Sequence, residues 1–191
     1  MNRSTLFRSF SLPKLGTQQL VVLALLMALD MVLGRLSVGT NMLRISFGFV
    51  AISLIAKLYG PLWTMLVAAV LDIVGATIIS PNGNFFFGFT LSAIVAGLIY
   101  GTAYYGYEHT RLLRVVIAVI LVSIIINLIS NTLWLQMMYH PISNWQTFYA
   151  FITPRLIKQI IFVPIQILIT YIFLNNAIIK HLITELFNKK S

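Results

Sequence analysis

The sequence predicts an all-α integral membrane protein: a bundle of six transmembrane helices with both chain termini in the cytoplasm. Of the 191 residues, 59% are hydrophobic and 9% are charged, whereas a soluble domain carries about 25% charged residues. A water-exposed surface needs more polar side chains than this chain has, so lipid must surround most of it. The apolar residues also fall into separate runs, several of them close to the ~20 residues that one membrane-spanning helix needs. We therefore expect one compact bundle and no separate soluble domain.

Glycine, proline and polar residues divide the first half of the chain into three predicted helices. Apolar runs at residues 18–34 and 47–59 predict the first two, and the second ends at Gly60-Pro61, a pair that interrupts helices because proline lacks a backbone N–H. The third is expected at residues 62–79, before the turn sequence Ser-Pro-Asn-Gly-Asn. Residues 1–17 carry three cations and no acid, and the apolar run after them is too long for a cleaved signal peptide. We expect a basic cytoplasmic arm there.

The second half of the chain predicts three more helices, at residues 86–104, 115–138 and 151–179. A polar loop with Glu108, Arg111 and Arg114 separates the first two, and a turn beginning at His140-Pro141 ends the second. The expected organisation is therefore a basic arm at 1–17, a six-helix membrane domain at 18–180 and a cytoplasmic tail at 181–191. Because the sequence has no internal repeat, it does not support a secondary transporter built from inverted repeats.

The distribution of cations predicts the orientation of the bundle and argues against nucleic-acid binding. The net charge is +9, but the cations lie in short gaps between apolar runs rather than in one solvated patch. With six helices, nine of the 13 cations fall on the side of the termini, and an excess of cations marks the cytoplasmic side. The other four lie at helix ends on the outer side, where a binding site would use them: Arg35, Arg44, Arg155 and Lys158.

Two predicted helices carry a polar stripe. Residues spaced by three or four positions share a helix face, and because unpaired polar groups are costly in hydrocarbon, such a face should point into the bundle or a cavity. The fifth helix carries Ser123, Asn127, Ser130, Asn131 and Trp134, and the sixth carries Arg155, Lys158, Gln159, Phe162 and Gln166. Interhelical hydrogen bonding is an equal alternative for the deep Asn127 and Gln166. The residues at the outer end of the two stripes favour a ligand site instead. They are Asn131, Trp134, Arg155, Lys158 and Gln159.

Two acids lie inside the predicted spans, and an ionisable residue in a span indicates a functional site. An ion pair with Arg35 or Arg44 is the alternative, which we prefer for Asp30 and leave open for Asp72. A carboxylate such as that of Asp72 can accept two parallel hydrogen bonds from an amidine-like edge, the edge that a pterin presents.

Small residues spaced four apart predict close helix contacts. Ala24 and Ala28 lie roughly opposite Asp30 on a helical wheel. If Asp30 faces the interior, the alanines face outward, which favours docking onto a partner over packing within the chain. A similar stripe, for which both explanations stand, contains Ala93, Gly97 and Gly101.

No enzyme signature accompanies these features. The three histidines are scattered over loops and the tail, and there is no cysteine. Neither a nucleophile–base pair, a metal-ligand spacing nor a phosphate-binding loop occurs. We therefore expect a non-catalytic protein without a cofactor.

Four segments carry a family resemblance. They are residues 43–50 (LRISFGFV), 87–93 (FGFTLSA), 131–134 (NTLW) and 154–159 (PRLIKQ). They resemble the folate-specific S components, the substrate-binding subunits of energy-coupling factor (ECF) transporters, and the resemblance covers most of the chain. It implies a subunit in the plasma membrane of a bacterium that binds folate from outside and topples to carry it inward. Its partners would be two ATPase subunits and a transmembrane coupling subunit, onto which Ala24 and Ala28 would dock.

The resemblance also implies roles for the candidate residues. Trp134 and an outer phenylalanine would stack on the pterin, whose edge Asn131 and Asp72 would address. The cations would bind the two carboxylates of the folate tail. The complete expected site contains Arg44, Asp72, Asn84, Asn131, Trp134, Arg155, Lys158 and Gln159.

Two other functions stand as alternatives: an S component for another vitamin, such as riboflavin or thiamine, and a membrane assembly subunit that transports nothing. A thiamine site should favour acids, whereas this outer face is cationic. A membrane-embedded enzyme would need paired acids or histidines in its spans, which hold only Asp30 and Asp72 as acids.

Overall fold

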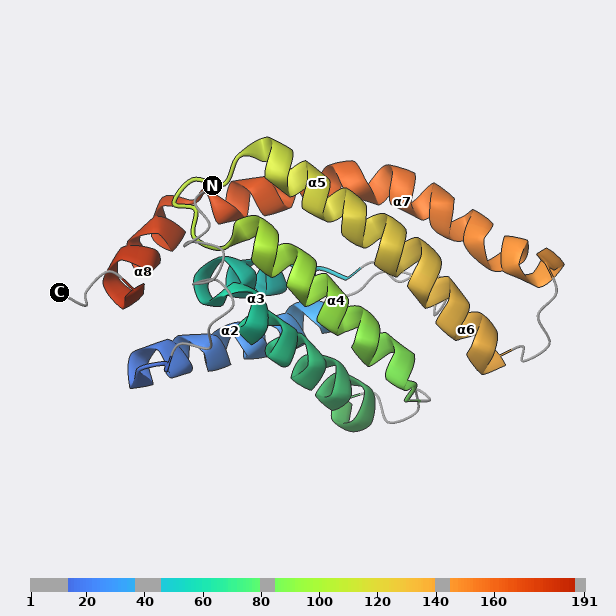
Figure 1. Ribbon diagram of the computed structural model, residues 1–191, viewed down its shortest axis with the longest axis horizontal. Helices are drawn as coiled ribbons and strands as arrows, with labels where there is room; N and C mark the ends of the chain where they lie inside the picture. The colour runs from blue at the N-terminus through green and yellow to red at the C-terminus, as the bar shows by residue number, and fades with distance from the viewer. Residues whose placement is uncertain (1–13, 37–45, 80–84, 140–144, 188–191) are drawn as a thin grey trace.

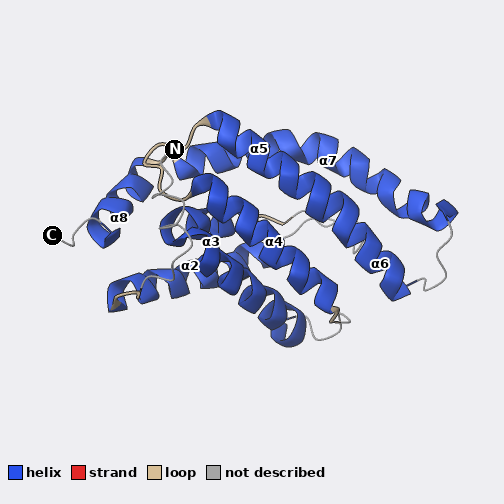
Figure 2. Cartoon of the chain, in the orientation of Figure 1, coloured by secondary structure: helices blue, strands red, loops and turns tan. Residues whose placement is uncertain are grey.

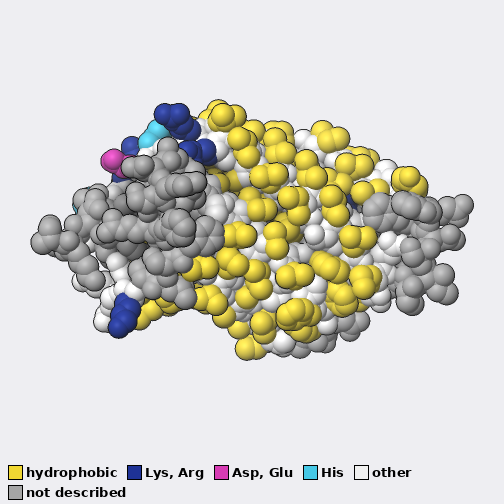
Figure 3. All heavy atoms as spheres, in the orientation of Figure 1, with side chains coloured by type: hydrophobic (Ala, Val, Ile, Leu, Met, Phe, Trp, Pro, Cys, Tyr) yellow, Lys and Arg dark blue, Asp and Glu magenta, His cyan; other side chains and the backbone are white. Residues whose placement is uncertain are grey.

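The computed structural model describes residues 14–36, 46–79, 85–139 and 145–187, and every regular element in these ranges is a helix (Figure 2). The predicted all-α class is therefore confirmed. Five helical segments are long and apolar enough to cross a membrane: Thr17–Arg35, Phe49–Ile78, Phe87–Tyr104, Leu112–Met138 and Ile152–Leu174. Hydrophobic side chains cover the middle of the visible face, and most of its Lys and Arg side chains gather at one end (Figure 3). Such a band is typical of a protein that lipid surrounds.

The first two helices are α2 (Thr17–Arg35) and α3 (Phe49–Val74), and α3 continues as the π-helical segment η1 (Gly75–Ile79). A kink at Gly60 divides α3 into two segments. The backbone of Gly60 (φ 82°, ψ 179°) lies in a region that glycine adopts readily and other residues do not. Pro61 follows and has no N–H to continue the helix. The chain bends at Gly60-Pro61, as predicted, but the expected second and third helices form one kinked helix rather than two separate ones.

The next helix, α4 (Phe87–Tyr104), packs along α3. A Cβ added to Gly101 would lie 2.3 Å from the Cα of Pro61, and one added to Gly97 would lie 3.0 Å from the carbonyl O of Thr64. Backbones approach this closely only where one helix lacks a side chain. The two glycines of the α4 stripe therefore serve packing within this chain.

The helix α5 (Leu112–Val122) continues through the π-helical segment η2 (Ser123–Ser130) into α6 (Asn131–Tyr139), so the predicted fifth helix is confirmed. The long helix α7 (Trp145–Leu174) and the short helix α8 (Ala177–Phe187) follow. The main core is enclosed by α3, α4, α5 and α7, and its most buried members are Ala56, Tyr104, Val115, Val119 and Leu174. In Figure 1, α8, the start of α2 and the α4–α5 connection lie at the same end of the bundle.

The last long helix differs from the prediction of 151–179, since it begins at Trp145 and ends at Leu174. Its end is set by contacts with the α4–α5 connection. The side chain of Asn175 donates to the carbonyl O of Thr110 (3.0 Å) and accepts from the N–H of Thr110 (2.9 Å). Buried Lys57 donates to the carbonyl O of Leu174, where a cation also stabilises the negative end of the helix dipole. The polar pair Asn175-Asn176 interrupts the apolar sequence at this point, so the sequence carried a signal for the end that the prediction of 151–179 did not use.

Candidate ligand-binding site

The first turns of α4 connect two of the predicted site residues through buried hydroxyl groups. The Oγ1 of Thr90 donates to Asp72 Oδ2 (2.6 Å), which joins α4 to α3. The Nε1 of Trp134 donates to Ser92 Oγ (2.8 Å), which joins α6 to α4. Thr90 and Ser92 are buried, so each bond holds its partner in one position. The helix α4 therefore positions both a carboxylate and an indole ring.

An aromatic cluster surrounds the indole. The rings of Phe86 and Trp134 lie 5.8 Å apart in a tilted arrangement, and those of Phe86 and Phe89 lie 6.1 Å apart, edge to face. A Cβ added to Gly88 would lie 2.5 Å from the rings of both Phe86 and Trp134. These two rings occupy the space that a side chain at Gly88 would need. Phe86 is therefore an outer phenylalanine that lies beside Trp134.

Asn131 precedes Trp134 by one helical turn. Its Oδ1 atom is buried, and no described residue donates a hydrogen bond to it. A buried carbonyl without a donor costs about 1–3 kcal/mol. This amide oxygen therefore has an acceptor position that no described residue fills.

The polar stripe of α7 faces the interior, as predicted. The residues between its members are exposed, with 59% of Ile157, 73% of Ile160 and 64% of Ile161 accessible, while Gln159 and Gln166 are buried. Two stripe residues contact the helix of the other stripe: Ser123 Oγ bonds Gln159 Oε1 (3.2 Å), and Arg155 Nη1 donates to the carbonyl O of Asn127 (3.2 Å). In a π-helical segment such as η2, the regular pattern of backbone hydrogen bonds is altered, and this leaves carbonyl groups that can accept a bond from a side chain.

The charge of Arg155 is held by a carbonyl rather than by a carboxylate. Lys158 follows one turn later on the same face of α7, so two cations share this part of the interior. A ligand carboxylate would complement the cations of α7.

The contact of Gln166 supports interhelical hydrogen bonding, the alternative to a ligand-binding role for this residue. Its Nε2 donates to the hydroxyl of Tyr100 (3.1 Å), a bond between α7 and α4 in the buried core. Asn127 contributes its backbone carbonyl to Arg155. Gln166 and Asn127 therefore each take part in a contact between two helices.

The geometry of α2 agrees with the helical-wheel argument. Asp30 is half-buried, and a Cβ added to Gly48 would lie 2.9 Å from its Oδ1, so the carboxylate faces the start of α3. Ala24 and Ala28 are exposed. The alanines therefore face outward while Asp30 faces the bundle.

Two predicted site residues, Arg44 and Asn84, lie outside the described residues. The sequence argument did not select Thr90, Ser92 or Gly88. The signal for the first two was available: hydroxyl residues in the first turns of an apolar helix need buried partners. Among the described residues, no group of His, Cys, Asp and Glu side chains could hold a metal ion.

Comparisons with known proteins agree on one family. Residues 18–174 match the family described as ECF transporter, substrate-specific component. The folate transporter FolT of Leuconostoc mesenteroides is 55% identical over 181 residues, which are 95% of this chain and 97% of that protein. FolT of Clostridium novyi is 35% identical over 80% of this chain and 85% of its own length. A crystal structure of FolT bound with folic acid superposes with a TM-score of 0.76 at 40% identity, covering 84% of this chain and 94% of that one.

Proposed function

This chain belongs to the family of substrate-specific components of ECF transporters, and on that premise we propose that it binds folate at the outer face of a bacterial membrane for import. Relatives that carry the name folate transporter, and a related structure that contains folic acid, support this substrate. The family consists of transporter subunits rather than enzymes, so folate is cargo and not a cofactor. The energy of ATP hydrolysis would come from partner subunits.

One observation of the site carries the choice of ligand: the buried Oδ1 of Asn131 has no donor among the described residues and lies one turn from Trp134. A pterin presents ring N–H and amino donors along one edge, and it has flat faces. Asn131 would accept from that edge, and the ring would stack on Trp134 or Phe86. Asp72 would accept a second bond, because Thr90 occupies one of its two oxygens.

The cations would bind the other end of folate, a glutamate with two carboxylates. Arg155 and Lys158 share a face of α7, and Arg44 is the third cation of the expected site. Planar guanidinium groups match carboxylates in a two-point geometry. Gln159 and Asn84 complete the proposed set.

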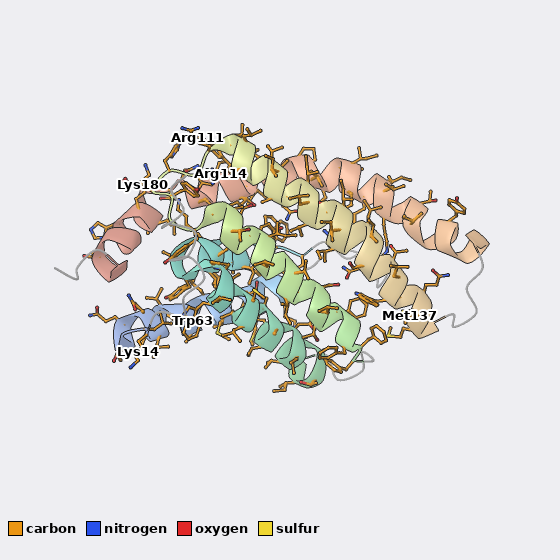
Figure 4. All side chains as sticks on the ribbon, viewed as in Figure 1. Lys14, Trp63, Arg111, Arg114, Met137 and Lys180 are labelled. Carbon is orange, nitrogen blue, oxygen red and sulfur yellow. The ribbon has the colours of Figure 1, made fainter. Side chains whose placement is uncertain are left out.

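The proposed orientation places both termini in the cytoplasm and counts six helices, with the two segments of α3 taken separately. Figure 4 shows Lys14, Arg111, Arg114 and Lys180 at one end of the molecule. An excess of cations favours the cytoplasmic side for this end.

The proposed partners are a transmembrane coupling subunit and two ATPase subunits, and the exposed pair Ala24 and Ala28 is the proposed docking surface. Ala24→Trp or Ala28→Trp would place a large ring where two helices must approach closely. We expect uptake of folate to be lost while binding to the isolated protein is retained. Loss of binding together with uptake would show that the alanines pack within this chain.

Isothermal titration of the purified protein with folate, riboflavin and thiamine tests the substrate. We expect heat of binding for folate alone. Tighter binding of riboflavin would identify a different vitamin, and binding of none of the three by a folded protein would favour the assembly subunit.

A further inference from the structure

The connection between α4 and α5 places an aromatic ring and two arginines at the boundary of a membrane-spanning segment. Arg111 directly precedes the span that begins at Leu112, and Arg114 lies in its first turn. The guanidinium carbon of Arg114 lies 3.7 Å from the centre of the Tyr107 ring. Figure 4 shows both arginines together at the basic end of the molecule. The geometry is that of a cation held on an aromatic face.

This stacking leaves the binding edge of Arg114 available. The ring covers one face of the guanidinium plane, whereas the N–H donors point outward within that plane. In the described ranges, the Arg114 guanidinium stacks on the ring of Tyr107, and the Arg111 side chain takes part in no hydrogen bond or ion pair. The donor fork of a guanidinium matches two oxygens of a phosphate group.

Two apolar residues, Leu112 and Leu113, lie between the two cations in the sequence. Leu112 is 50% exposed and Leu113 is 67% exposed, at the point where the span enters hydrocarbon. A ligand that touched all four residues would need an anionic head and an apolar tail. The acid nearest in sequence, Glu108, is attracted to Lys57, whose Nζ donates to the carbonyl O of Glu108 (3.2 Å). This attraction reduces the repulsion that an anion would meet.

We propose that the corner formed by Tyr107, Arg111 and Arg114 binds the phosphate of an anionic phospholipid, with Leu112 and Leu113 against its acyl chains. The charge of the corner complements the headgroup, and its position at the end of a span matches the depth of the phosphate layer. The proposal is independent of folate and of the direction in which the bundle faces, because it depends only on the membrane boundary. The site would anchor the basic end of the bundle in its leaflet.

Native mass spectrometry of the full chain with phosphatidylglycerol or phosphatidylcholine tests the proposal. We expect the wild type to retain phosphatidylglycerol preferentially, and Arg111→Gln and Arg114→Gln each to weaken its binding about fivefold, the effect of about one surface cation. Tyr107→Leu should weaken the binding of phosphatidylglycerol although the charge is unchanged. Tyr107→Phe should bind it like the wild type, because the ring remains. Lys14→Gln is the matched control, since it removes an exposed cation at the same end that stacks on no aromatic ring of the described residues.

Three outcomes would overturn the proposal. Equal weakening by Lys14→Gln would show a diffuse surface charge rather than a site. Equal retention of phosphatidylglycerol and phosphatidylcholine would show that the site does not recognise the net negative charge of the headgroup. Competition by glycerol phosphate as effective as that of the lipid would show a site for a free phosphate. Titration of each variant with folate confirms that it is folded, because neither arginine belongs to the proposed folate site.

Discussion

Substitution of Gly88 by alanine tests whether folate binding depends on the positions of the Phe86 and Trp134 rings. The new Cβ would lie 2.5 Å from Phe86 Cε1 and from Trp134 Cδ2, whereas ordinary contact begins at 3.4 Å. Each ring must therefore move by about 0.9 Å, since two carbons cannot approach so closely. Both neighbours are side chains, so we expect the rings to shift and the helix to remain.

The shift has a calculable effect on Trp134. Its Nε1 donates to Ser92 Oγ at 2.8 Å. A displacement of about 0.9 Å along this bond would lengthen it to about 3.7 Å, beyond hydrogen-bonding distance. Loss of a partly buried donor's partner costs about 1–3 kcal/mol. If Trp134 stacks on the pterin, folate affinity should fall about fivefold to a hundredfold.

Isothermal titration with folate measures this change, and Gly75→Ala is the matched control. Gly75 is also helical, but a Cβ there would have nothing within 4 Å, so its folate affinity should stay within about twofold of wild type. Ser92→Ala removes the same hydrogen bond without the steric overlap and should reproduce part of the loss. Unchanged affinity in Gly88→Ala would refute the assignment of Trp134 to the ligand site.

Three further predictions concern charge and orientation. Arg155→Met and Lys158→Met should each weaken folate binding about tenfold to a hundredfold, the value of one charged hydrogen bond, but weaken a pterin fragment without glutamate much less; equal losses in titrations with both ligands would assign these cations to the fold or the ring. Lys57→Met should lower the thermal unfolding midpoint in detergent, because it removes the donor to the carbonyls of Leu174 and Glu108, while folate affinity stays unchanged; an unchanged midpoint would show that this buried cation contributes nothing net. Asn82→Cys should react with a membrane-impermeant thiol reagent in intact cells; reaction after lysis alone would reverse the proposed orientation.

Much of the fold was readable from the sequence because its determinants are local. Apolar runs predicted the helices, and Gly60-Pro61 predicted the kink, since backbone geometry at glycine and proline depends little on the rest of the chain. The polar stripe of α7 predicted which side faces the interior, because helical periodicity fixes the relative direction of residues spaced by three or four. The outward direction of Ala24 and Ala28 followed from the same rule.

The pairing of residues between helices was decided by the tertiary structure. The contacts of Asp72 with Thr90 and of Trp134 with Ser92 join residues 18 and 42 positions apart. No periodicity within one helix specifies which neighbour it meets, or at what height. At the end of α7, Asn175 and Lys57 bond the last turn to other parts of the chain, whereas the sequence marks the same point only by the polar pair Asn175-Asn176. By itself the sequence determined the approximate positions of the helices and the faces that they turn inward, since these depend on local pattern and composition. The tertiary structure alone decided which helices supply the hydroxyl groups and rings around Asp72 and Trp134, because packing brings together residues that are distant in the chain.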